Sequence, residues 1–182
     1  MKSLFALVLL FATPLAAHDS PETVVTAFYS RIVADHPLGI PEQATKDALW
    51  PLMTPRLTRI LEMARACEAD YTKKHANSDE KPEFWWLEAG LFSGANEMAL
   101  PAKFEILGTE VLPDQRQKVT LRFTYAETLE SSFLWRSAAI VDCRKERCLV
   151  DDFVPFDIDT AQPLTPLSES FGDCKNGKWI GR

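Results

Sequence analysis

The spacing of apolar residues in the first part of the chain is that of α-helices. A capping residue stands directly before each of the two longer apolar stripes, Ser20 before the first and Thr54 before the second, and a proline follows each cap. The stripes consist of Val24, Val25, Phe28, Tyr29, Ile32 and Val33, and of Leu57, Ile60, Leu61, Ala64, Cys67, Glu68 and Tyr71. Prolines bound a shorter candidate helix over residues 41–49. We therefore expect three helices, the longest beginning after Thr54.

After Pro101 the pattern changes to that of β-strands. Residues 119–125 alternate between Val, Leu, Phe and Tyr on one side and Thr and Arg on the other, which predicts a strand with one buried and one solvated face. Further candidate strands lie at 103–111, 132–143 and 148–156. Helices that precede an antiparallel meander are typical of an α+β fold. We expect N-terminal helices packed on an antiparallel sheet of about four strands.

The N-terminus has the features of a secretory signal peptide. Lys2 supplies a single positive charge, and the apolar run 4–11 that follows is too short to span a bilayer. Small residues then favour cleavage after Ala17, and an uncleaved membrane anchor is the less favoured alternative. We expect residues 1–17 to be removed and 18–182 to form a single soluble domain, periplasmic or secreted, with no membrane span.

The charge balance disfavours nucleic acid as a partner. The chain carries 20 basic and 26 acidic side chains, a net charge of −6. Removal of Lys2 with the signal peptide would leave a net charge of about −7. A nucleic-acid backbone would require the opposite sign. The chain also contains no GxSxG, no HExxH and no phosphate-binding glycine loop, so no motif assigns a reaction.

Four cysteines in an exported chain predict two disulfides. Cys143 ends one candidate strand and Cys148 begins the next. The charged stretch between them is expected to be the exposed connection of a hairpin, with both thiols within disulfide reach. Cys67 and Cys174 are then the remaining pair, and their bridge would tie the tail to the longest helix. We expect this pairing among the three that four cysteines allow.

We expect neither a metal ion nor another cofactor. A zinc site would need two closely spaced cysteine pairs or additional histidines, and only His36 and His75 lie in the expected folded body. The hairpin cysteines are also too far apart in the sequence for a CxxC redox centre.

Four short motifs between Val24 and about Cys174 resemble those of a known family. They are AFYSRIV in the first candidate helix, LWPLMTPRLTRIL at the start of the longest one, LEAGLFSG at 87–94 and CLVDDFVPF in the last candidate strand. The chain resembles the small exported bacterial proteins grouped as domain of unknown function 3828, which look related to the NTF2-like fold. This resemblance implies a curved antiparallel sheet wrapped around helices, with a cavity at the open end of the cone. It implies no reaction.

Asp151 and Asp152 are candidate functional carboxylates in the last candidate strand. Neighbours in a strand point to opposite faces, so one of the two is expected to face the helices or the cavity. A buried carboxylate there would have a raised pKa or a hydrogen-bonding partner. Such a group could abstract a proton or hold a helix end. We favour the structural role, because ion-pair networks also perturb carboxylates.

Trp85, Trp86 and Tyr125 are candidate ligand-binding aromatic residues. The two tryptophans lie in 84–94, a stretch without a clear period that is expected to form a loop over the core. They could line a pocket, but packing in the core is the favoured interpretation, because large apolar residues are usually inside. The Tyr125 hydroxyl could contact a ligand or, as is more common, a backbone carbonyl.

Two functions are compatible with these candidates. In the first, the protein binds a small ligand or a protein partner of the cell envelope, with Trp85, Trp86, Tyr125 and one of the two aspartates lining the site. In the second, it is an acid–base enzyme of ketosteroid-isomerase type, with the inward aspartate as base and a tyrosine as donor. We favour binding, because the expected inward faces are mostly Val, Leu, Phe and Ala and offer few titratable groups.

Overall fold

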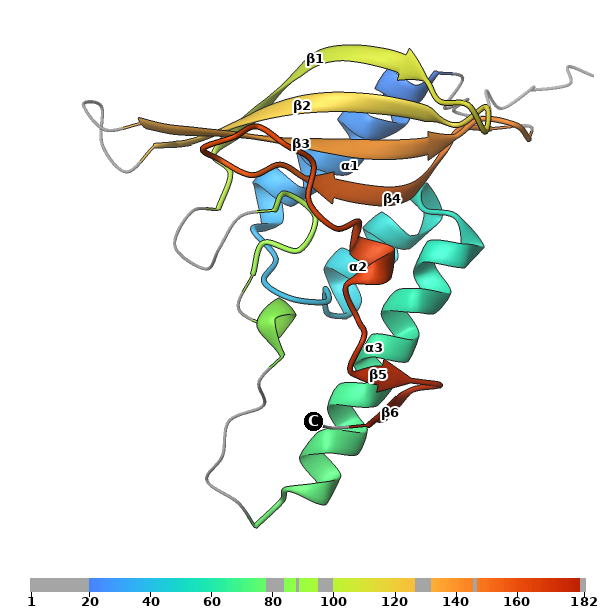
Figure 1. The fold of residues 1–182 in the computed structure, drawn as a ribbon, viewed down its shortest axis with the longest axis vertical. Helices are drawn as coiled ribbons and strands as arrows, with labels where there is room; N and C mark the ends of the chain where they lie inside the picture. The colour runs from blue at the N-terminus through green and yellow to red at the C-terminus, as the bar shows by residue number, and fades with distance from the viewer. Residues whose placement is uncertain are drawn as a thin grey trace, which may run out of the picture.

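The computed structural model describes residues 20–77, 84–87, 89–94, 100–126, 132–145 and 147–180. Within these ranges the chain forms three α-helices, a four-stranded sheet and a small two-stranded sheet (Figure 1). The expected α+β class is therefore confirmed. The expected signal peptide, residues 1–17, lies outside the described ranges.

Capping side chains set the starts of the two longer helices. The helices are α1 (Pro21–Asp35), α2 (Gln43–Leu49) and α3 (Pro55–Lys74), with short 3-10 helices η1 (Trp50–Leu52), η2 (Trp85–Leu87) and η3 (Leu167–Glu169). The hydroxyl of Ser20 accepts a hydrogen bond from the Thr23 amide, and that of Thr54 accepts one from the Leu57 amide. α2 begins later than expected because Glu42 has extended backbone angles. None of the described helices is both long and apolar enough to cross a membrane.

The four strands of the main sheet pair antiparallel in chain order. They are β1 (Lys103–Val111), β2 (Gln117–Ala126), β3 (Ser132–Asp142) and β4 (Leu149–Pro155). The buried side chains of β2 alternate with more exposed ones as predicted, and they are Val119, Leu121 and Phe123. The pattern did not indicate the small hairpin of β5 (Cys174–Lys175) and β6 (Lys178–Trp179).

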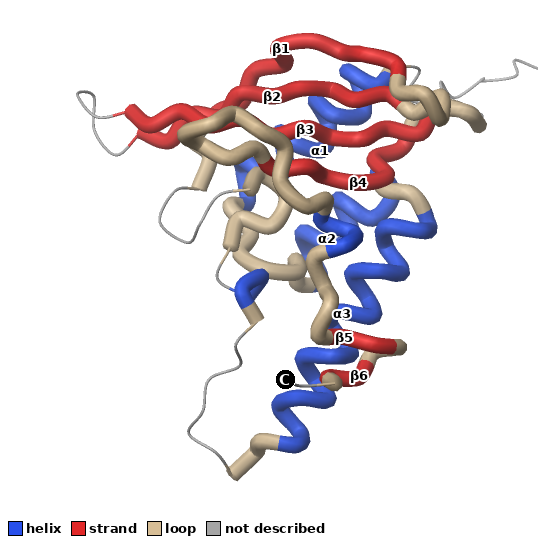
Figure 2. The backbone as a smooth tube through the Cα atoms, in the orientation of Figure 1, coloured by secondary structure: helices blue, strands red, loops and turns tan. Residues whose placement is uncertain are grey.

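α1 lies along one face of the main sheet and forms the centre of the core with it (Figures 1 and 2). Phe28 and Tyr29 of α1 pack against Phe92, Phe123 and Phe153, and none of these five side chains is more than 1% exposed. The ring centroids of Phe28 and Phe92 are 5.3 Å apart, and those of Tyr29 and Phe123 are 5.1 Å apart. Aromatic rings therefore fill the space between α1 and the sheet.

α3 begins beside β4 and extends away from the sheet, with the β5–β6 hairpin against its far half (Figures 1 and 2). A disulfide between Cys67 and Cys174 joins the two, with a Cα–Cα distance of 5.8 Å. A second disulfide, Cys143–Cys148, closes the β3–β4 hairpin with a Cα–Cα distance of 4.1 Å. Both pairings are those expected from the sequence.

Candidate functional site

Asp151 and Asp152 lie at a β-bulge, which changes where their side chains point. The pairing of β3 with β4 shifts next to Val141 and leaves Asp151 as the extra residue of β4. Both carboxylates consequently approach one guanidinium group. Asp151 Oδ2 is 3.8 Å from Arg56 Nη1, and Asp152 Oδ2 is 3.5 Å from Arg56 Nη2. The expectation that the two side chains would point to opposite faces of the strand is therefore wrong.

The partners of the two carboxylates support the structural interpretation. Asp151 accepts hydrogen bonds from Thr54 Oγ1 and Arg116 Nη1, each at 2.7 Å. Asp152 accepts from the amide and the hydroxyl of Ser168 at 3.0 and 2.5 Å, which fastens η3 to β4. Because Thr54 is the N-cap residue of α3, Asp151 holds a helix end.

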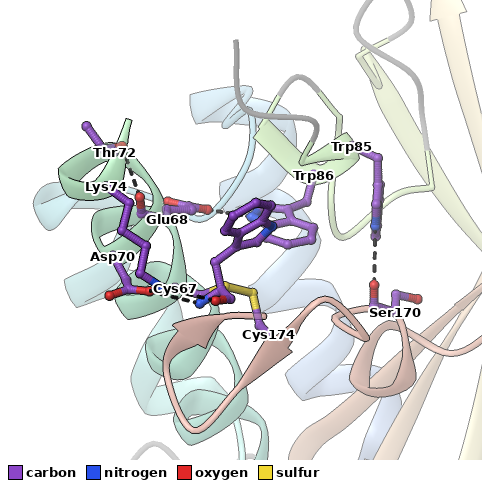
Figure 3. Close-up of a disulfide and its surroundings, with 10 residues drawn as sticks. Cys67, Glu68, Asp70, Thr72, Lys74, Trp85, Trp86, Ser170 and Cys174 are labelled. Carbon is purple, nitrogen blue, oxygen red and sulfur yellow. Dashed lines mark hydrogen bonds and ion pairs between the residues drawn. A yellow bond between two sulfur atoms is a disulfide. The ribbon is translucent and has the colours of Figure 1, made fainter. Parts of the chain in front are cut away.

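The aromatic candidates divide between the core and the surface. Trp86 is 1% exposed, and its Nε1 donates a hydrogen bond of 2.5 Å to Glu68 (Figure 3). Trp85 is 51% exposed, and its Nε1 donates to the Ser170 carbonyl at 3.3 Å. Tyr125, near the end of β2, is partly buried. Trp86 is therefore a core residue, as favoured above, whereas Trp85 is not.

The five candidate residues do not form one site. Asp151 contacts the first turn of α3, whereas Trp86 contacts Glu68 on the far half of the same helix. At a rise of 1.5 Å per residue, these two points on α3 are about 20 Å apart. Asp151 and Trp86 are therefore too far apart to line one small pocket.

A cleft of about 540 Å³ opens beside Asp151, between the start of α3, the β1–β2 turn and the β3–β4 hairpin. We call it the arginine cleft. Its lining consists of Thr54, Pro55, Arg56, Asp114, Arg116, Asp142, Arg144, Lys145, Arg147, Leu149 and Asp151. Five of these side chains are cationic and three are anionic, which is a local excess of two positive charges in a chain of net charge −6.

Carboxylates hold two of the arginines in fixed positions. Arg116 donates to Asp114 through Nε and to Asp151 through Nη1, each at 2.7 Å. Arg144 donates to Asp142 through Nε and Nη2 at 2.9 and 2.8 Å, and these hydrogen bonds are the main reason why the pKa of Asp142 falls to about 2. Hydrogen bonds from the backbone and side chain of Arg116 likewise lower the pKa of Asp114. Asp114 and Asp142 therefore stay ionised near neutral pH and keep the guanidinium groups oriented.

The other three cationic side chains are exposed to solvent, as is that of Arg144. Arg56 is fixed by hydrogen bonds to the Asp151 carbonyl at 3.0 Å and to Ser168 Oγ at 3.1 Å, yet its side chain is 49% exposed. Lys145 and Arg147 are exposed in the hairpin connection, and no described residue forms an ion pair with either. The cleft thus presents two kinds of cationic side chain to solvent. Arg56 is held in place, whereas Lys145 and Arg147 can adjust to a ligand.

The chemistry of the lining is that of anion binding. Guanidinium groups bind carboxylate and phosphate oxygens through paired hydrogen bonds. The lining residues include neither histidine nor cysteine, and the Thr54 hydroxyl donates to Asp151. Proton transfer at neutral pH would need a group whose pKa lies near the working pH. The lining is therefore suited to binding rather than to acid–base chemistry.

The arginine cleft was not among the expected sites. Arg144, Lys145 and Arg147 do lie exposed in the hairpin connection, as predicted. The sequence did not predict that α3 and the β1–β2 turn lie beside them. The only available signal was the run of charged residues between Cys143 and Cys148.

Comparisons of the chain with protein-family models, curated proteins and solved structures gave no match. The family resemblance therefore stays a prediction, and a function has to be inferred from the cleft itself.

Proposed function

We propose that the protein is a binding module that holds a small polyanion, bearing carboxylate or phosphate groups, in the arginine cleft. The observation that carries this inference is the fixed position of Arg116 and Arg144, each hydrogen-bonded to aspartate at 2.7–2.9 Å, beside the half-exposed Arg56. An anion that replaces water in the arginine cleft therefore encounters hydrogen-bond donors that are already oriented.

Fixed donors favour binding because little side-chain entropy is then lost when a ligand arrives. Asp114, Asp142 and Asp151 provide this order in the absence of ligand. The exposed Lys145 and Arg147 add attraction at longer range, which salt screens over about 10 Å at 0.1 M. A ligand with several negative charges would use both kinds of group.

We include in this proposal an NTF2-like fold and a place in the periplasm or outside the cell. Support for the fold comes from the order of helices and antiparallel strands. Support for the compartment comes from the two disulfides, which persist in oxidising surroundings. An acidic segment of an envelope protein would offer similar chemistry, but a cleft of about 540 Å³ is in the size range of small-ligand sites.

The acid–base enzyme has less support. Its base would be Asp151 or Asp152 and its acid a tyrosine. Both carboxylates instead bind Thr54, Arg116 and Ser168, and within the described part of the chain no tyrosine hydroxyl donates to either.

Titration calorimetry with citrate and with inorganic pyrophosphate tests the polyanion proposal. The mature protein is expected to bind at least one of the two saturably, and more weakly when salt is raised from about 0.05 to about 0.5 M. Arg147→Gln is expected to lower the affinity about tenfold, equivalent to about 1.4 kcal/mol. This variant is informative because Arg147 is exposed and supports no described contact.

Arg59→Gln is the matched control. Arg59 is also an exposed arginine, but it lies further along α3 and outside the cleft lining. Its variant is expected to bind as the wild type does. Failure of the wild type to bind either probe, or an equal loss in both variants, would contradict the proposal.

A further inference from the structure

A second hollow lies on the face of the main sheet that is turned away from α1. It is a groove of about 330 Å³ lined by Arg122, Leu134, Trp135, Arg136, Asp157, Ile158 and Ala161. Figure 1 shows the segment after β4 passing in front of the sheet, while α1 lies behind it. The groove shares no lining residue with the arginine cleft.

Two arginines stand directly opposite each other in this groove. Arg122 of β2 is in register with Arg136 of β3, and like charges at such positions repel. Arg122 forms an ion pair with Glu105 at 2.5 Å, whereas no described carboxylate forms one with the exposed Arg136. An anion between the two guanidinium groups would relieve the repulsion and accept hydrogen bonds from Arg136.

Apolar side chains border the arginine pair. Leu134 is 52% exposed and lies two positions before Arg136, on the same face of β3. Ile158, which is 53% exposed, lines the groove from the segment that follows β4. Water is released favourably when an apolar partner covers such side chains.

A well-bonded turn holds Ile158 in this position. The Asp157 carboxylate accepts hydrogen bonds from the Thr160 hydroxyl at 2.7 Å, the Thr160 amide at 2.8 Å and the Asp159 amide at 3.2 Å. The Ala161 amide donates to the Asp157 carbonyl at 2.9 Å, and Ala161 has a φ of 54°, in the left-handed region. The carboxylate of Asp157, the one carboxylate among the groove's lining residues, therefore stabilises this turn. Because the turn is fixed, the exposed Ile158 side chain is preorganised.

We propose that this groove binds a free single-chain carboxylate with an apolar tail, its head between Arg122 and Arg136 and its tail against Leu134 and Ile158. A small anion without a tail would leave the apolar side chains in water. An apolar molecule without a head would desolvate Arg136 and give it no partner. The groove volume lies at the lower end of the range for small-ligand sites.

Decanoate, kept below its micellar concentration, is the probe for this site. Nuclear magnetic resonance titration of the isotope-labelled mature protein is expected to show saturable shifts at Leu134, Arg136 and Ile158. Arg136→Gln is expected to weaken decanoate about tenfold, and Ile158→Ser several-fold. Acetate, which has the head alone, is expected to bind far more weakly than decanoate.

Controls separate this site from general charge and from the arginine cleft. Arg59→Gln and Arg147→Gln are expected to keep the wild-type affinity for decanoate, so the result does not depend on the polyanion proposal. Circular dichroism is expected to show unchanged folding of the Arg136 and Ile158 variants, because both side chains are exposed. Absence of binding, shifts confined to other surfaces, equal binding of decyltrimethylammonium, or unchanged affinity in both groove variants would overturn the proposal.

Discussion

Thr54 Oγ1 donates a hydrogen bond of 2.7 Å to the Asp151 carboxylate, across 97 positions of the chain. The same hydroxyl accepts from the Leu57 amide at 3.2 Å, and the Thr54 amide donates to the Val150 carbonyl at 2.8 Å. The cap of α3 and the bulge of β4 are therefore one hydrogen-bonded unit. That unit also places Arg116, the second partner of Asp151, in the arginine cleft.

Breaking this unit from either side is expected to cost stability. Thr54→Val removes both the cap and the donor to Asp151, and we expect a loss of about 2 kcal/mol. Asp151→Asn removes one of the two carboxylate partners of Arg116 and of Arg56, and we expect a loss of about 2 kcal/mol. In a double-mutant cycle measured by urea unfolding, the two losses should be non-additive by at least about 0.5 kcal/mol.

Thr58→Val is the matched control for this cycle. Thr58 lies one turn later on α3, and its hydroxyl donates only to the Pro55 carbonyl on the exposed side. Its loss is expected to stay within about 0.5 kcal/mol. Additive effects of Thr54→Val and Asp151→Asn would show that cap and bulge are independent.

The two disulfides are expected to contribute unequally. The Cys67–Cys174 bridge spans 107 residues and the Cys143–Cys148 bridge spans 5. In the loop-entropy model the double alanine variant of the first loses about 5 kcal/mol and that of the second about 2 kcal/mol. Denaturant unfolding of the two variants measures this, and a larger loss from the short bridge would contradict the entropic account.

Local periodicity was sufficient to predict most of the fold. The stripe after Thr54 contains all five residues that α3 buries, Leu57, Leu61, Ala64, Cys67 and Tyr71, because their spacing places them on one face of any helix. The strand alternation was equally informative, because a pleated strand separates its side chains regardless of its neighbours. To predict the disulfide of the hairpin cysteines, it was sufficient to expect two adjacent strands to be antiparallel.

The candidate site could not be predicted in the same way. The direction of the Asp151 side chain depends on a bulge, which is a property of the β3–β4 register and not of either strand alone. The arginine cleft joins side chains from three separate segments of the chain. Trp85 and Trp86 are neighbours in a stretch without a period, so no pattern could show that one is exposed and the other buried.

Acid is expected to weaken the β3–β4 hairpin through Asp142. Its pKa is lowered from 3.8 to about 2, chiefly by hydrogen bonds from Arg144. A group whose pKa is lowered by folding stabilises the folded state above its unfolded pKa. This contribution should be present above pH 3.8 and should be lost as the pH falls through about 2.

Arg144→Gln is expected to raise the pKa of Asp142 toward its ordinary value, and carboxyl chemical shifts followed through a pH titration measure this directly. Arg147→Gln is the matched control, because Arg147 occupies the same hairpin connection without contacting Asp142 among the described interactions. An unchanged pKa of Asp142 in the Arg144 variant would show that another group stabilises the carboxylate.

Glu68 is expected to give the opposite pH dependence. It lies in the apolar stripe of α3 and accepts the Trp86 hydrogen bond at 2.5 Å (Figure 3). Burial raises the pKa of Glu68 above its ordinary value of 4.5, although the hydrogen bond from Trp86 acts against this rise. Because the folded protein binds this proton more tightly, Glu68 should lower stability as the pH rises from 4.5 through the folded pKa.

Glu68→Gln keeps an acceptor for Trp86 Nε1 and removes the charge. As the pH rises from about 4.5 to 7, the free energy of unfolding of this variant should therefore fall less than that of the wild type. Trp86→Phe removes the donor and should enlarge the fall, because the pKa of Glu68 then rises further. Urea unfolding at both pH values gives these differences, and contributions from other titrating groups cancel between variants. Glu169→Gln is the control, since Glu169 is an exposed glutamate of η3 and its removal should leave the difference unchanged. Wild-type pH dependence in Glu68→Gln would mean that the charge of Glu68 is fully solvated in the folded protein.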